Sequence, residues 1–105
     1  MQRRAFDRVS ANIPVRFSCC NVDYSGIIID LSENGMYINT HEMCFPFDSR
    51  LEIIIPLNVK ILKVPVELSR ITKTGNIFNG MGVYLANAPD DYLDFVRKLK
   101  SEQYT

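Results

Sequence analysis

Three arginines near the N-terminus have a spacing and a chemistry suited to a phosphate-bearing ligand. Arg4 and Arg8 are separated by three residues, and Arg3 directly precedes this pair. The planar guanidinium fork matches a phosphate as well as the O6/N7 edge of guanine, and its face stacks on a base. Residues 1–16 hold four arginines against one aspartate, whereas the whole chain has 12 basic and 12 acidic side chains. A basic segment on a neutral chain favours a local anionic partner, although alone it is also typical of a solvated tail.

A second segment, residues 30–35, brings a carboxylate, a hydroxyl and a glycine together after a β-branched run. The Asp30 carboxylate is able to accept hydrogen bonds from N–H donors, and the Ser32 hydroxyl is able to donate one to an oxygen. Gly35 would let a ligand approach the backbone or let the turn reach a positive φ. The same pattern is typical of an Asx or Ser turn that ends a strand, and that interpretation is compatible with binding.

Short strands are the elements expected to position these two segments. Their apolar residues alternate or are β-branched, and turn residues separate them. The predicted strands are residues 13–18, 26–31, 36–39, 51–55, 63–72 and 77–85. Residues 32–35 predict a hairpin turn between the second and third strands. Gly80 and Gly82 indicate a bulge or a close approach of backbones in the last strand.

A single helix is predicted, at the C-terminus. Helical spacing is confined to one apolar stripe, formed by Tyr92, Phe95, Val96 and Leu99. Six strands followed by an amphipathic helix predict an all-β fold with one C-terminal helix, a six-stranded antiparallel β-barrel capped by that α-helix. The helix is then a structural lid rather than a recognition helix.

The length of 105 residues predicts one domain over residues 1–105. We expect a flexible arginine-bearing arm at 1–11, the barrel at 12–86 and the helix at 88–103. A hydrophobic fraction of 47% excludes a disordered chain, and no apolar run approaches the length of a membrane span. The three cysteines and the absence of a secretory signal favour the cytoplasm.

Together and in this order, the two segments resemble the PilZ family, whose pattern is Arg-x-x-x-Arg followed by (Asp/Asn)-x-Ser-x-x-Gly. Every position of the pattern is filled, by Arg4, Arg8, Asp30, Ser32 and Gly35. Residues 80–85 also resemble the family's closing Gly-Val-x-Phe strand, from which Leu85 departs. The resemblance covers nearly the whole chain. We call Arg4 and Arg8 the arginine motif, and Asp30, Ser32 and Gly35 the turn motif.

The resemblance implies that the chain binds the bacterial second messenger cyclic di-GMP, without another cofactor or metal. Arg4 and Arg8 would contact phosphate and guanine, Asp30 and Ser32 a guanine and its neighbouring phosphate, and Gly35 would shape the turn. Arg3 occupies the position that in the family is associated with a stacked pair of ligands, which predicts a mutually intercalated ligand dimer.

Arg70 and five aromatic residues are further candidates for contact with the ligand. Arg70 would reach the ligand, as a basic residue there sometimes does in the family, or form a surface ion pair, and is left out of the predicted site. Five aromatic residues are expected in the barrel core rather than as stacking platforms: Tyr37, Phe45, Phe47, Phe78 and Tyr84.

The resemblance also implies how a signal would leave the domain. Ligand phosphates would cancel the repulsion between the arginines and order the arm. The consequence would pass to a separate effector protein, in pathways of motility, adhesion and biofilm or exopolysaccharide synthesis. The alternative from another class is a PilZ-like protein-interaction module that does not bind nucleotide.

Other functions find little support in the sequence. The balanced charge, and basic residues bunched at the N-terminus, argue against binding a nucleic acid polymer. No arrangement resembles a nucleophile with its base or a paired general acid and base, so we do not expect an enzyme. His41 and Cys44, with the distant Cys19 and Cys20, match a zinc site poorly, and free thiols are the simpler interpretation.

Overall fold

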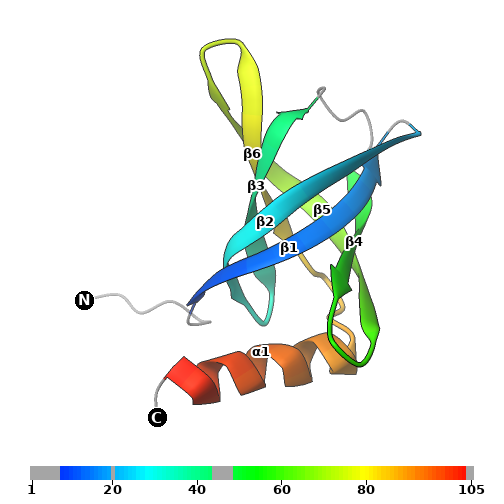
Figure 1. The fold of residues 1–105 in the computed structure, drawn as a ribbon, viewed down its shortest axis with the longest axis vertical. Helices are drawn as coiled ribbons and strands as arrows, with labels where there is room; N and C mark the ends of the chain where they lie inside the picture. The colour runs from blue at the N-terminus through cyan, green and yellow to red at the C-terminus, as the bar shows by residue number, and fades with distance from the viewer. Residues whose placement is uncertain (1–7, 20, 44–48, 104–105) are drawn as a thin grey trace.

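The computed structural model describes residues 8–19, 21–43 and 49–103. In this part of the chain, six antiparallel strands close into a barrel in the order β1-β2-β3-β6-β5-β4, and one helix follows (Figure 1). The elements are β1 Val9–Cys19, β2 Val22–Ser32, β3 Gly35–Met43, β4 Arg50–Pro56, β5 Ile61–Thr74, β6 Ile77–Tyr84 and α1 Asp90–Gln103. The predicted six-stranded barrel with a C-terminal helix is confirmed. Within the described residues, no helix is both long and apolar enough to span a membrane.

The barrel begins earlier in the chain than its sequence pattern predicts. β1 starts at Val9, which pairs with Leu31, and the next residue, Ser10, pairs with Asp30. Residues 9–11, which we assigned to the arm, therefore belong to the barrel. A register shift between Ser10 and Ile13 breaks the alternation of side chains, so the sequence pattern does not show where this strand begins.

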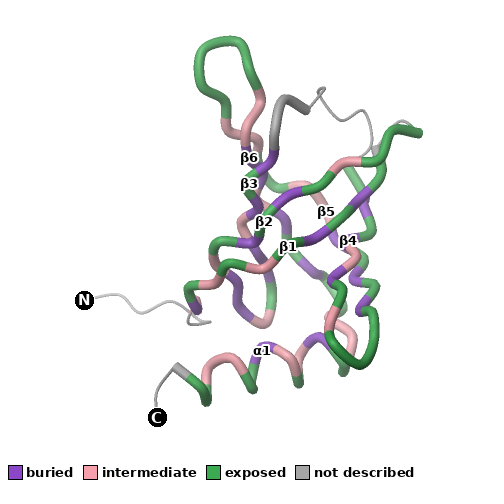
Figure 2. Tube along the Cα trace, in the orientation of Figure 1, coloured by how far each residue is buried: buried purple, intermediate pink, exposed green. Residues whose placement is uncertain are grey.

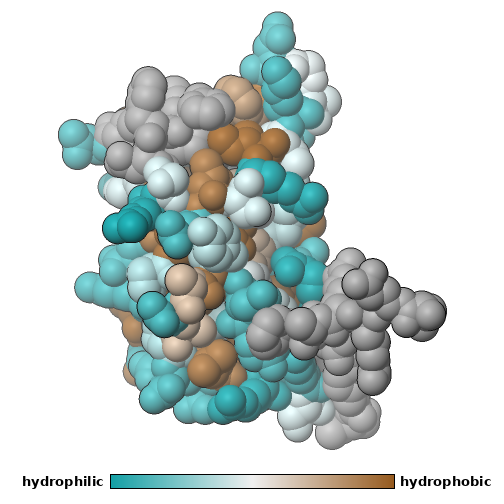
Figure 3. All heavy atoms as spheres, turned by 180° about the vertical axis from the view of Figure 1, so that it is seen from behind, coloured by the Kyte–Doolittle hydropathy of each residue, from teal (hydrophilic) through white to brown (hydrophobic). Residues whose placement is uncertain are grey.

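Side chains that alternate inward along the strands fill the barrel (Figure 2). The largest of them include Phe17, Ile28, Ile38, Ile53 and Met81. Helix α1 lies across one end of the barrel and adds the fully buried Tyr92 and Val96 to the same core (Figures 1 and 2). The apolar stripe of the helix is thus a lid on the barrel. On the face opposite to that of Figure 1, apolar side chains reach the surface in small groups between polar ones (Figure 3).

The two glycines of β6 mark places where neighbouring side chains, rather than the predicted backbones, come close. A Cβ at Gly80 would collide with the phenol oxygen of Tyr37 and the hydroxyl of Thr72. A Cβ at Gly82 would lie 3.1 Å from Cγ of Arg70. The pairing of β5 with β6 also shifts register between Thr72 and Lys73, where Asn79 is the extra residue of β6 beside Gly80, which is the bulge expected in this strand.

Candidate functional site

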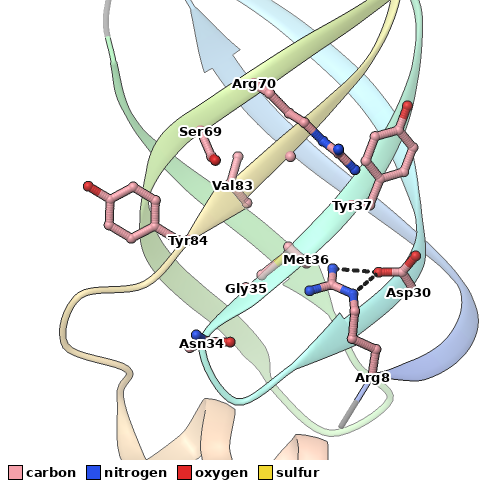
Figure 4. Close-up of a pocket in the computed structure, with 11 residues that line it drawn as sticks. Arg8, Asp30, Asn34, Gly35, Met36, Tyr37, Ser69, Arg70, Val83 and Tyr84 are labelled. Carbon is pink, nitrogen blue, oxygen red and sulfur yellow. Dashed lines mark hydrogen bonds and ion pairs between the residues drawn. The ribbon is translucent and has the colours of Figure 1, made fainter. Parts of the chain in front are cut away.

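A pocket of about 600 Å³ opens on the outer surface of the barrel, over β3, β6 and β5 (Figure 4). At one end it is lined by Arg8, Asp30 and the turn between β2 and β3. At the other end it is lined by Arg70 of β5, which reaches toward Tyr37 of β3 (Figure 4). The pocket is therefore flanked by a guanidinium at each end.

Arg8 and Asp30 join the two sequence motifs at one end of this pocket. Nε of Arg8 donates to Oδ1 of Asp30 at 2.6 Å, and Nη2 lies 2.5 Å from the same oxygen. The pairing of Ser10 with Asp30 accounts for the contact, because Arg8 immediately precedes β1 and is carried to the end of β2. Both side chains are about one-third exposed, at 31% and 36%. Among the described residues only Oδ1 is engaged, which leaves Oδ2 as an acceptor at the pocket rim.

Ser32 shapes the turn and does not line the pocket. Its side chain is 1% exposed, and its Oγ donates to Oδ1 of Asn34 at 2.8 Å. The backbone N–H of Asn34 donates back to Ser32 Oγ at 3.4 Å. The Ser-turn interpretation is confirmed, while the contact of Ser32 with a phosphate stays a prediction.

Gly35 is needed for the approach of two strands rather than for an unusual backbone angle. Among the described glycines, a positive φ occurs only at Gly75, so the positive-φ alternative for Gly35 is wrong. A Cβ at Gly35 would lie 2.8 Å from the carbonyl oxygen of Val83, on β6. The same Cβ would lie 3.9 Å from Nη1 of Arg8, so the small residue also keeps this corner of the pocket open.

Tyr37 and Arg70 are the site residues that the sequence prediction missed. Tyr37 is half-buried on the outer face of β3 and lines the pocket, so placing it in the core was wrong. Cζ of Arg70 lies 5.7 Å from the centre of the Tyr37 ring, and within the described residues Arg70 forms no ion pair. The outward position of Tyr37 could have been predicted from the alternation of side chains along a strand. Met36 and Ile38 point inward from β3, so the residue between them must point outward.

The remaining predicted aromatic and site residues divide into two groups. Tyr84 is 44% exposed and so is also not a core residue, while Phe78 packs half-buried against the core. The other group lies outside the described residues, and their roles stay predictions: Arg3, Arg4, Phe45 and Phe47.

The comparison with family models gives one match, to the PilZ domain, over residues 2–99. The chain belongs to the PilZ domain family. In the comparison with curated protein sequences, nothing matched. The fold resembles several solved structures, among them the following three, each under 25% identical to this chain.

The first of these structures is the Bacillus subtilis inhibitor of motility MotI/DgrA, with a TM-score of 0.78 and 15% identity over 99% of this chain. This chain spans 53% of that protein, about half its length. The PilZ domain of Escherichia coli YcgR, solved with c-di-GMP, has a TM-score of 0.73 and 18% identity, covering 97% and 95% of the two chains. The CeSA PilZ domain from a cellulose-synthesizing bacterium has a TM-score of 0.59 and 22% identity, covering 90% and 98%.

In this PilZ domain, α1 holds the turn that follows Asp30. Oη of Tyr92 donates to the carbonyl oxygen of Ser32 at 2.8 Å, and burial raises the pKa of Tyr92. Nζ of Lys100 donates to both carboxylate oxygens of Glu33, at 2.7 and 2.9 Å. The Lys100 hydrogen bond lowers the pKa of Glu33. The helix thus fixes the turn on one side, while the other side of the turn faces the pocket.

No cluster of three or more His, Cys, Asp or Glu side chains suited to a metal ion occurs in the described part of this PilZ domain. The pairs that the sequence offered, around Cys19 and Cys44, involve side chains outside that part.

Proposed function

We propose that this PilZ domain is a non-catalytic receptor for cyclic di-GMP, which binds in the pocket over β3, β6 and β5. The observation that carries the proposal is the contact between Arg8 and Asp30, because it joins the arginine motif and the turn motif at the rim of one pocket. The likeness to the YcgR PilZ domain, which was solved with c-di-GMP, supports the same ligand.

Each motif residue has a role that fits the chemistry of this ligand. Arg8, with Arg4 and Arg3 from the preceding segment, binds the phosphates and stacks on guanine. Oδ2 of Asp30 accepts from N1–H and N2–H₂ of a guanine, which selects guanine over adenine. Ser32 holds the turn that presents Gly35, and its proposed contact with a phosphate requires that binding exposes its Oγ and breaks the hydrogen bond to Asn34 Oδ1.

The proposed signal is the ordering of the N-terminal arm as it closes over the ligand. The repulsion between neighbouring guanidiniums falls when two phosphates lie between them. The arm and the covered pocket then form a surface that a separate effector protein recognises, in the cytoplasm and in control of motility or biofilm formation.

Isothermal titration calorimetry of the full chain with cyclic di-GMP tests the receptor. Arg8→Ala should weaken binding by about 2–4 kcal/mol, because it removes charge-assisted and partly desolvated contacts. Arg97→Ala is the matched control, since Arg97 is an exposed residue of α1 that pairs with Asp94. Its affinity should equal that of the wild type.

Two outcomes would contradict the proposal. One is unchanged binding by the Arg4→Ala, Arg8→Ala double variant. The other is a thermal shift with GTP or an oligonucleotide that equals the shift with cyclic di-GMP. A chain that none of these ligands stabilises would be the protein-interaction module instead.

A further inference from the structure

Four residues form one row across four neighbouring strands of the barrel. Asp30 of β2 pairs with Tyr37 of β3, Tyr37 pairs with Gly82 of β6, and Gly82 pairs with Arg70 of β5. Adjacent strands lie about 4.8 Å apart, so the row measures about 14 Å from Asp30 to Arg70. Arg8 extends it through its contact with Asp30. The row thus runs from a guanidinium and a carboxylate, through an aromatic ring and a glycine, to a second guanidinium.

The missing side chain at Gly82 leaves room for the stem of Arg70. The stem of Arg70 lies across Gly82, where a Cβ would be 3.1 Å from its Cγ and 3.2 Å from its Nε. This path brings the guanidinium to the Tyr37 ring. Arg70 is exposed and has no ion pair within the described residues, so only the weak contact with the ring holds its charged group in place.

Tyr37 is held in a fixed orientation at its hydroxyl end. Its Oη lies 2.5 Å from Oγ1 of Thr72, and the hydroxyl rests where any side chain at position 80 would collide with it. A ring fixed by its backbone at one end and by a hydrogen bond at the other loses little freedom when a ligand stacks on it. The ring is therefore a prepared flat surface within the pocket.

We infer that Tyr37 is the surface on which a purine base of the ligand stacks, and that Arg70, whose guanidinium lies over the Tyr37 ring in the structure, moves off the ring to cover the opposite face of that base. The inference rests on the proposed function and names a base-stacking pair for it. The quadrupole of the ring attracts a cation or a base over its face, and stacking on an aromatic ring tolerates any base. Arg8 and Asp30 at the other end of the row then read the guanine edge and a phosphate.

Calorimetry with cyclic di-GMP tests the stacking through matched variants of the full chain. Tyr37→Leu keeps an apolar side chain and removes the ring face, so affinity should fall about tenfold. Tyr37→Phe keeps the ring and loses only the Thr72 hydrogen bond, so affinity should stay within about threefold of the wild type. Arg70→Gln should weaken binding in the same direction as Tyr37→Leu. Thermal melting checks that each variant is folded.

A fluorescence measurement reports the stacking itself. The chain contains no tryptophan, so Tyr37→Trp introduces a single indole into the pocket. Cyclic di-GMP should quench its emission in step with the heat of binding, because a stacked guanine contacts the indole directly. Tyr24→Trp is the control, since Tyr24 stacks on Phe17 with ring centres 5.6 Å apart and does not line the pocket. Its emission should not change.

The outcomes separate this inference from the receptor proposal. Wild-type affinity in Tyr37→Leu, or binding without quenching in Tyr37→Trp, would overturn the stacking role and leave the receptor intact. Failure of the wild-type chain to bind cyclic di-GMP would overturn both.

Discussion

At the scale of single residues, Asp30 has two roles in the proposed site. Its Oδ1 accepts both contacts from Arg8, which fixes the direction of that guanidinium. Its Oδ2 has no partner among the described residues and is the acceptor proposed for guanine. One carboxylate thus couples the position of the phosphate-binding arginine to the reading of the base.

Asp30→Ala should therefore lose affinity and selectivity together. Binding of cyclic di-GMP should weaken by about 1–3 kcal/mol, because a hydrogen bond to a charged group is removed from ligand and arginine alike. The preference for cyclic di-GMP over cyclic di-AMP should shrink, since adenine does not need the carboxylate. Parallel titrations with the two ligands measure this ratio. A variant that still rejects cyclic di-AMP as strongly as the wild type would contradict the role in base reading.

The site residues that could be predicted from the sequence are those whose roles follow from their own type and from their immediate neighbours. Arg8 and Asp30 were identifiable because their types and order carry the chemistry, and the structure confirms that they meet. The turn role of Ser32 followed from its neighbours. Tyr37 was placed in the core because its aromatic character outweighed its position between two inward residues. The close approach behind Gly35 is a contact with Val83 on a distant strand, which no local pattern reveals.

At the scale of elements, α1 is both a lid on the barrel and a clamp on the turn beside the pocket. The apolar stripe predicted the lid. The clamp was not predictable, because Lys100 and Glu33 are 67 positions apart and only the closed barrel brings them together. Tyr92 adds a buried hydrogen bond to the same turn.

The clamp predicts a pH dependence of stability. The pKa of Glu33 is lowered below its ordinary value of 4.5 in the folded chain, so this carboxylate stabilises the fold fully above that value. The stabilisation is lost as pH falls through the lowered pKa, where Glu33 takes up a proton. Glu33→Gln should therefore reduce the free energy of unfolding by about 1 kcal/mol at neutral pH, and by almost nothing well below the folded pKa.

Urea unfolding at several pH values measures this difference. The Lys100 and Glu33 side chains are only 20% and 23% exposed, which protects the pair from screening. Asp94→Asn is the control on the same helix, because the Asp94–Arg97 pair is 77% and 65% exposed. Its effect should stay within about 0.5 kcal/mol. A loss in Glu33→Gln that persists unchanged at low pH would show that packing, rather than the ion pair, fixes the turn.

At the scale of the whole molecule, closure of the barrel places residues from both ends of the chain around one pocket. The start of β1 brings Arg8 to the end of β2, and the pairing of β3 with β6 brings Tyr37 and Arg70 into the same row. The sequence predicted the number of strands and the cap, but strand order decides which outward residues share a face. That order depends on contacts between distant segments, so the far half of the pocket was not predicted.

We expect the number of ligands per chain to depend on the N-terminal segment together with this pocket. Arg3 is proposed to lie against a second cyclic di-GMP that stacks on the first, which the Tyr37–Arg70 end of the row holds. The wild-type chain should therefore bind two ligands in calorimetry, and Arg3→Ala should bind one, because a guanidinium over an exposed guanine face contributes about 1–2 kcal/mol. Arg3→Lys keeps the charge without the stacking plane, so it separates the two contributions. A wild-type titration that ends at one ligand per chain would remove the stacked pair, while binding through Arg8 and Asp30 would stand.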